Sequence, residues 1–393
     1  MKSLSFAAFK STAISSILAA TMASLVLSGC GRTIKHSKLD TVEVPETPIK
    51  SQYRVGFCWS YGTIGFLETL LLKKNGQTMD FSEEALGFYR MAEELRALSK
   101  KYPASELATA DMVSQKVFEG LQGWDMTFNP AYNPGMPVRN SMQLVQDYGV
   151  VPESAWSYKF DTDEKLDKFS ATVFAGFASL MTQRGQGNVT QDMVFDLLAS
   201  PDAFGSRPPT EFDYTSPAGD TAKVSAKDFV ANVIGFTPDD YTYLIPDQTI
   251  GYDQIVKATK LTLARGINVP LSYAIYDGSI NQWDASHSAK DLDPANLKLD
   301  GGHLVLITDF VNKGGRPGAV AADVLQTELA KPSSELDFVV IKNSWDTRPQ
   351  SPVLRLPGYY TMDQGYISLL SKKQTDITVV VPRDIAFAVR YGN

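Results

Sequence analysis

Residues 52–61 read QYRVGFCWSY and decide the fold. Directly after them, Ile64, Leu67 and Leu71 recur at helical spacing as an apolar stripe, which predicts a buried helix that starts at or near Cys58. At the first turn of a helix, unpaired backbone N–H groups and the positive end of the helix dipole favour a thiolate over a thiol. We therefore expect a lowered pKa and a nucleophilic sulfur at Cys58.

Two glycines, Gly62 and Gly65, lie on the same predicted helix. Each costs about 1 kcal/mol of helix propensity relative to alanine, so their presence needs a reason. We expect them to allow another element to pack closely against the helix.

Composition narrows the class of protein before any further motif is considered. The chain has 393 residues, 44% of them apolar and 21% charged, which is typical of one or two globular domains. A net charge of −7 argues against a nucleic-acid partner, because a surface that binds nucleic acid must be basic enough to neutralise phosphates. Two cysteines cannot form a disulfide framework or a Cys-rich zinc site. We expect no metal and no cofactor.

The first thirty residues have the charge order of an export signal. Lys2 and Lys10 precede an apolar stretch over 13–27, and no acidic residue occurs before Asp40. This stretch is shorter than the roughly 20 residues that a membrane-spanning helix needs. Residues 27–30 read LSGC and resemble the bacterial lipobox, in which the cysteine is acylated with lipid and becomes the mature N-terminus. The alternative is an ordinary signal peptide that happens to contain Cys30.

This resemblance implies an exported chain anchored to the bacterial cell envelope through lipid on Cys30. Because Gly31, and not aspartate, follows the cysteine, we expect the periplasmic face of the outer membrane or the cell surface. Residues 30–50 are polar and suit a tether. His36 lies in this tether with no second Cys or His ligand nearby, so we assign it no role.

The candidate base is His303, which opens the strand-like run 303–308 after two glycines. A cysteine nucleophile turns over only if a base takes its proton and returns it to the leaving amine. The competing base is His287, whose polar neighbours at 285–288 predict a solvated loop.

A further motif, Asn343-Ser344-Trp345, follows a β-branched run at 338–341. Together with a glutamine six residues before a Cys-Trp pair, and a histidine after small residues, it resembles the papain-like cysteine peptidases. The resemblance implies that Gln52 and the Cys58 N–H form the oxyanion hole. It also implies that Asn343 orients His303, and that Trp345 shields their hydrogen bond from water at the substrate site.

The resemblance extends over 52–99, 135–156, 299–310 and 337–367. The wording GVVPE at 149–153 is similar to the bleomycin-hydrolase-like branch, as is the short interval before Gln52, which holds no propeptide of family type. Of a glycine pair that contacts substrate in the family, only Gly135 is present. Phe57 replaces a small residue, which we expect to alter the entrance to the site, and Asp346 replaces the glycine that usually follows the tryptophan.

The expected fold is α+β and papain-like: a helical left domain and a β-rich right domain with the active-site cleft between them, plus a large insertion. We expect a signal peptide over 1–29, a tether over 30–50, the left domain over 51–160, an insertion or linker over 161–225, and the right domain over 226–393. Closing strands are predicted at 377–381 and 385–389.

The function predicted from these residues is that of an exported thiol protease acting on a peptide or protein substrate. Two alternatives remain: a catalytically inert papain-fold lipoprotein that binds peptides or serves as a structural module, and an enzyme that transfers the acyl group to an amine. The glycine-rich turn at 314–318 lacks the spacing of a phosphate-binding loop, so it indicates no nucleotide.

Overall fold

Helix α1 (Cys58–Asn75) begins at Cys58, and its N-cap is Phe57. The apolar stripe predicted from the sequence is buried, since Ile64, Leu67 and Leu71 are each fully covered. The helix ends at Gly76, whose φ of 74° is the left-handed conformation that glycine adopts without strain. The predicted helix and its starting residue are confirmed.

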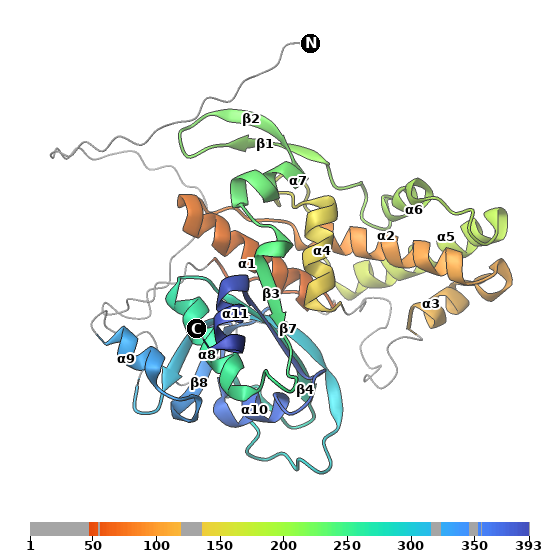
Figure 1. Cartoon of the computed structure of the whole chain (residues 1–393). Coiled ribbons are helices and arrows are strands. Elements are labelled where there is room, and N and C mark those ends of the chain that lie inside the picture. Colours follow the sequence, from red (N-terminus) through yellow and green to blue (C-terminus); the bar gives the residue numbers. More distant parts are fainter. Residues whose placement is uncertain are drawn as a thin grey trace. The chain divides into compact units, whose positions relative to one another are not determined.

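The computed structural model describes residues 47–53, 56–118, 136–315, 324–345, 353–354 and 356–392 (Figure 1). The other helices are α2 (Glu83–Lys101), α3 (Ala110–Phe118), α4 (Val138–Tyr148), α5 (Asp163–Arg184), α6 (Gln191–Leu198), α7 (Ala226–Asp228), α8 (Tyr252–Ala264), α9 (Leu325–Ala330), α10 (Gln364–Leu370) and α11 (Arg383–Tyr391). The strands are β1 (Glu211–Thr215), β2 (Thr221–Ser225), β3 (Tyr241–Leu244), β4 (Val269–Tyr276), β5 (Ile280–Asn281), β6 (Ser286–His287), β7 (Leu299–Asn312), β8 (Leu336–Lys342), β9 (Tyr359–Asp363) and β10 (Ile377–Pro382).

Helices α1 to α6 share one hydrophobic cluster, which we call the helical lobe. Helices α2 and α4 contact α1, and α5 contacts α3 and α6. Helix α2 starts after Ser82 with two glutamates in its first turn, where acidic groups favour the positive end of the helix dipole. Elements between 161 and 225 also pack in this cluster, and the domain boundaries stay predictions.

A mixed eight-stranded sheet with helices α8, α10 and α11 forms the second part, which we call the sheet lobe. The strand order is β3-β10-β4-β7-β8-β9-β6-β5, and every pairing is antiparallel except β6 with β9. Strand β7 lies between β4 and β8 and contacts α1. Its alternation sends Leu304 and Leu306 into the helical cluster and Val305 and Ile307 into the sheet cluster. One strand therefore belongs to both cores.

Close approach between α1 and β7 depends on the two glycines of the helix. A Cβ added at Gly62 would lie 2.7 Å from Leu304 Cγ, and one at Gly65 would lie 3.2 Å from Leu306 Cδ1. The predicted packing role of these glycines is confirmed.

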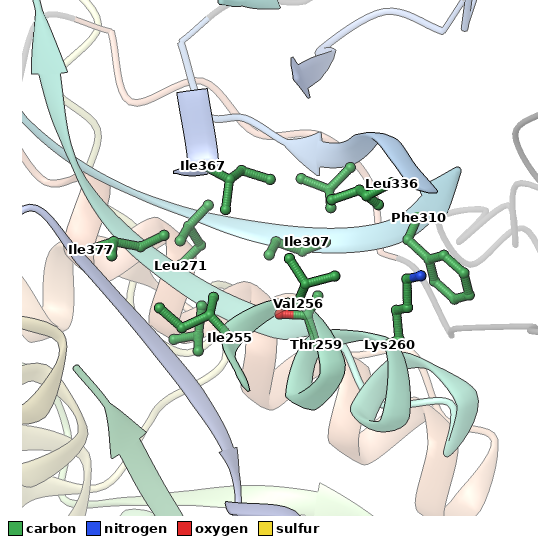
Figure 2. Close-up of a pocket in the computed structure, with 12 residues that line it drawn as sticks. Ile255, Val256, Thr259, Lys260, Leu271, Ile307, Phe310, Leu336, Ile367 and Ile377 are labelled. Carbon is green, nitrogen blue, oxygen red and sulfur yellow. The ribbon is translucent and has the colours of Figure 1, made fainter. Parts of the chain in front are cut away.

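Helix α8 covers one face of the sheet, and Figure 2 shows its side chains Ile255, Val256 and Thr259 directed at the strands. The space left between them is about 10 Å³, at the lower limit for one water molecule, so this is core packing and no ligand pocket. The buried Lys260 closes the end of this core, where its Nζ donates to Asn312 Oδ1 at 2.7 Å.

One strand prediction is confirmed and another is wrong. Residues 377–381 form β10, whereas 385–389 lie in helix α11. The buried residues of that segment, Ile385, Ala386 and Val389, also fit one face of a helix, and Pro382 supplies its N-cap. A short apolar run does not separate the two structures by periodicity alone.

Among the residues that the structure describes, every helix is too short or too polar to cross a bilayer.

We predict that Gly62→Ala destabilises the fold although alanine is the better helix former. The added Cβ would displace Leu304, whose backbone oxygen is also only 3.3 Å away, and such overpacking costs about 1–3 kcal/mol. Urea unfolding measures the free energy change. Gly65→Ala is the matched control with a smaller expected loss, because only the flexible end of Leu306 opposes it. A Gly62→Ala protein more stable than the native chain would contradict this account.

Candidate functional site

Cys58 and His303 line the same cavity, which has a volume of about 870 Å³. Cys58 is partly exposed at the first residue of α1, and His303 lies within β7, with only 4% of its surface exposed. The backbone N–H of Leu304, the residue after the histidine, donates to the Cys58 sulfur. The α1–β7 contact thus brings the predicted nucleophile and the predicted base to one site.

His303 is held through a hydrogen bond of 2.7 Å between its Nε2 and Asn343 Oδ1. Asn343 follows the last residue of β8, the strand paired with β7, and is 2% exposed. The same Oδ1 accepts the backbone N–H of Ser344 at 2.7 Å. Because a backbone N–H can only donate, the atom that faces it must be the amide oxygen, and His303 Nε2 must then carry a proton. The other ring nitrogen, Nδ1, is left as the basic one.

Trp345 stacks on His303, with ring centroids 4.2 Å apart and an angle of 22° between the planes. The indole therefore covers one face of the imidazole, as expected for a residue that shields it from water. Trp345 itself is partly exposed, and its role toward substrate stays a prediction.

Gln52 is buried beside the Asn343–Trp345 segment. Its backbone N–H donates to Ser344 O at 2.8 Å, and its side-chain Oε1 accepts from Ser344 Oγ at 2.6 Å. Since the oxygen end of the amide is used by Ser344, its donor end is the –NH2 group, which is the end that an oxyanion needs. Gln52 is not one of the described residues that line the cavity with Cys58, and its role in the oxyanion hole stays a prediction.

The segment that carries Gln52 is tied to both lobes by lysines. Lys50 Nζ contacts Glu68 at 2.7 Å, Asp80 at 2.6 Å and Glu83 at 2.5 Å in the helical lobe. On the other side, Lys342 of β8 donates to the backbone oxygen of Thr47 at 2.7 Å. Burial opposes the charge on Lys50, but the three carboxylates raise its pKa well above the usual value. Lys50 was not predicted from the sequence, because nothing local in the chain links it to these acidic residues.

Electrostatics at the site depart from the sequence expectation. Desolvation of the sulfur raises the pKa of the Cys58 thiol to about 11, while N–H groups of Leu304, Trp59 and Cys58 itself lower it only in part. Burial lowers the pKa of His303 to about 4, against the opposing effect of its bond to Asn343. The helix start does favour the thiolate, but burial outweighs it. Each group taken by itself is therefore neutral at neutral pH.

His287 is not in a solvated loop, which corrects the prediction. It belongs to β6 and is fully buried, with its Nε2 3.2 Å from the hydroxyl oxygen of Tyr273. Burial, and after it the neighbouring His303, lowers the pKa of His287 to about 3. The polar neighbours of His287 suggested a solvated loop, but they do not decide its burial. The two-residue strand β6 is held by pairing with β9, a partner far along the chain.

Phe57 does not shape the entrance to the site. It is 1% exposed and packs on α2, where a Cβ at Gly87 would lie 2.4 Å from its ring. The large side chain is accepted because Gly87 leaves room for it. Gly135 and Cys30 lie outside the described residues, so their predicted roles stay predictions; His36, to which no role was assigned, lies outside them too.

One group of carboxylates among the described residues could share a cation. Ligand atoms of Glu83, Glu84 and Glu153 lie within 4.8 Å of one another. Lys50 already contacts Glu83, and Lys159 lies 3.4 Å from Glu153. These acids line no part of the cavity that holds Cys58.

Comparison with known proteins places the fold. No family model and no curated protein matches the sequence. The chain is similar to the crystal structure of PepW from Lactobacillus rhamnosis, with a TM-score of 0.53 and 14% identity over 91% of this chain and 85% of that one. It also matches xylellain, a cysteine protease from Xylella fastidiosa, with a TM-score of 0.40 and 16% identity over 86% of this chain and 84% of that one. The predicted papain-like α+β fold is confirmed.

We predict that Lys50→Met lowers both stability and any activity that needs Gln52. Removing the ammonium leaves buried Glu68 and Glu83 without their cation, a loss of about 3–5 kcal/mol. Thermal or urea unfolding measures the change. Lys159→Met is the matched control: the Lys159 side chain is 57% exposed, so less than about 1 kcal/mol is expected. Equal effects of the two substitutions would rule out a special role for Lys50.

Proposed function

We propose that this chain is a cysteine peptidase that hydrolyses peptide bonds through an acyl-enzyme on Cys58. The observation that carries the proposal is a single arrangement. Cys58 at the start of α1 lines one cavity with a histidine that is bonded to Asn343 and covered by Trp345. Nucleophile, base and orienting group are the parts that acyl transfer requires.

In the first step, the Cys58 proton passes to Nδ1 of His303 and the sulfur attacks the substrate carbonyl carbon. Each group alone is neutral, so the proton transfer depends on the attraction between the two opposite charges that it creates in a desolvated site. Negative charge develops on the carbonyl oxygen, where the Cys58 N–H and the Gln52 side-chain –NH2 are the proposed donors. Removing one such donor typically costs about 10²–10³ in kcat.

In the second step, His303 returns its proton to the leaving amine as the C–N bond breaks, which produces a thioester on Cys58. Water then attacks this thioester, with His303 accepting a proton from the water, and the carboxylic acid leaves while the thiol is restored. Asn343 holds the ring through Nε2 in both directions, so Nδ1 is the nitrogen that takes and gives the proton.

The shape of the cavity favours a peptide over a small metabolite. Beyond the cysteine and histidine it extends along α4, from Val138 to Gln146, and along the strands β3 and β10. Its volume of about 870 Å³ is near the upper end of that of small-molecule sites, and its lining includes the charged residues Arg139, Asp239 and Arg383. An extended chain several residues long fits such a groove. We further propose that the enzyme belongs to the bleomycin-hydrolase-like branch, because residues 149–153 read GVVPE.

We further infer that the enzyme is exported and anchored by lipid on Cys30. This rests on the order of charge, apolar stretch and small residues before the cysteine, followed by a polar tether. With a tether of about twenty residues, the catalytic lobes would stand clear of the membrane surface.

Hydrolysis of a mixed peptide library by the purified chain, analysed by mass spectrometry, tests the proposed activity. We expect Cys58→Ala to abolish cleavage and leave the unfolding curve unchanged, because the side chain is small and at the cavity edge. The native protein should also react covalently with an epoxysuccinyl inhibitor at Cys58. Cleavage that persists in Cys58→Ala, or a native chain that neither cleaves nor reacts, would refute the assignment.

Metabolic labelling with a clickable fatty acid in a bacterial host tests the anchor. The native chain should incorporate the label and sediment with membranes, whereas Cys30→Ser should do neither and keep its peptidase activity. Cys58→Ser serves as the control, since it removes a thiol without touching the lipobox. Fatty-acid label that is retained in Cys30→Ser would contradict the inference.

A further inference from the structure

Tyr273 lies directly opposite His303 in the β4–β7 pairing. The two rings meet edge to face, with centroids 5.9 Å apart and planes at 72°. Tyr273 is 2% exposed and so is cut off from solvent. It therefore borders the proposed catalytic imidazole from the side of β4, while Trp345 covers a face of the same ring.

His287 completes a closed set of ring contacts, which we call the ring cluster: His303, Tyr273, His287 and Trp345. The His287 and Tyr273 rings are 5.3 Å apart and joined by the 3.2 Å contact between the hydroxyl oxygen and Nε2. On its other side, the His287 ring lies 6.2 Å from that of Trp345, which in turn lies 4.2 Å from His303. Four side chains from separate parts of the chain thus fix one another's positions.

Stability alone gives no reason for this buried polar pair. His287 Nδ1 is buried and has no hydrogen-bond partner among the described residues. A neutral imidazole has one donor and one acceptor nitrogen, so one of its two polar groups is unsatisfied whichever tautomer is present. Replacing both members of such a pair by apolar groups of similar shape is often neutral or stabilising. A polar pair kept behind a catalytic ring indicates a role in catalysis.

Without the ring cluster, little would restrain the His303 ring from rotating, and this suggests what the cluster does. Its bond to Asn343 is one point, about which the ring could pivot and carry Nδ1 away from the sulfur. Trp345 limits the pivot on one side and Tyr273 on another. Tyr273 can do so only if its own ring is held, and its hydroxyl bond to His287 holds it.

We propose that Tyr273 and His287 are positioning residues for the catalytic imidazole. The hydrogen bond between Tyr273 and His287 keeps the ring cluster closed and His303 aligned with Cys58. The proposal rests on the proposed peptidase function. The titratable groups that face the cluster are Cys58 on α1, Tyr360 on β9 and Tyr366 on α10, besides its own members. Because His287 stays neutral, no second cation opposes the charge that His303 gains during the reaction.

Tyr273→Phe tests the proposal, since it deletes only the hydroxyl. We expect kcat to fall roughly tenfold with KM changed by less than about twofold, as for a group that acts on the transition state only. His287→Phe should act alike, and the double variant should be no worse than either single one, because both remove the same bond. Tyr366→Phe is the matched control: its hydroxyl bonds Ala274 O and Ser279 Oγ, away from His303. It should lower the melting temperature without lowering kcat.

A second readout needs no peptide substrate. The rate at which iodoacetamide alkylates Cys58 reports its thiolate, so the pH profile of that rate reports how readily the Cys58 proton passes to His303. In Tyr273→Phe and His287→Phe the rise of this profile should move to higher pH, because a loosened imidazole stabilises the thiolate less.

Profiles and kcat values that match the native protein in both single variants would overturn the proposal, as would losses equal to those of Tyr366→Phe. A native chain that cleaves no peptide but shows the expected profile shifts would refute the peptidase function alone.

Discussion

The contact between helix α1 and strand β7 is the constraint on which the site depends. Cys58 is the first residue of the helix, and His303 directly precedes the leucine that packs on Gly62. A helix with a larger side chain at this position would stand further from the strand and take the sulfur with it. The distance between the reacting groups is thus set by packing inside the protein, where displacements are costly because interiors are closely packed.

The other parts of the site converge on the short segment after β8. Asn343 binds the imidazole, Ser344 binds Gln52 through side chain and backbone, and Trp345 covers the ring. Three consecutive residues therefore couple the base to the oxyanion donor. Because Lys50 ties the Gln52 segment to the helical lobe, the same few residues also join the two halves of the molecule.

Burial gives this site its electrostatic character. Desolvation raises the pKa of the thiol and lowers that of the imidazole, so the resting groups favour neutrality. The charges of the reaction would then arise together, in a setting where their mutual attraction is weakly screened. The neutral Tyr273–His287 pair behind His303 is consistent with a site that keeps other charges away.

Local sequence determined the elements and the reactive groups: the helix from Cys58, the packing glycines, and the candidates His303, Asn343 and Gln52. The helix and its glycines follow from short-range patterns, since periodicity and spacing reflect forces between residues near in the chain. His303, Asn343 and Gln52 were identified instead from the resemblance of their motifs to the papain-like cysteine peptidases. Only the tertiary structure decided that His287 is buried against Tyr273, that Phe57 fills the space above Gly87, that Lys50 meets three carboxylates, and that 385–389 is helical. Each of these depends on a partner distant in sequence, and burial by such partners changes a side chain's solvation in a way that its neighbours along the chain do not reveal.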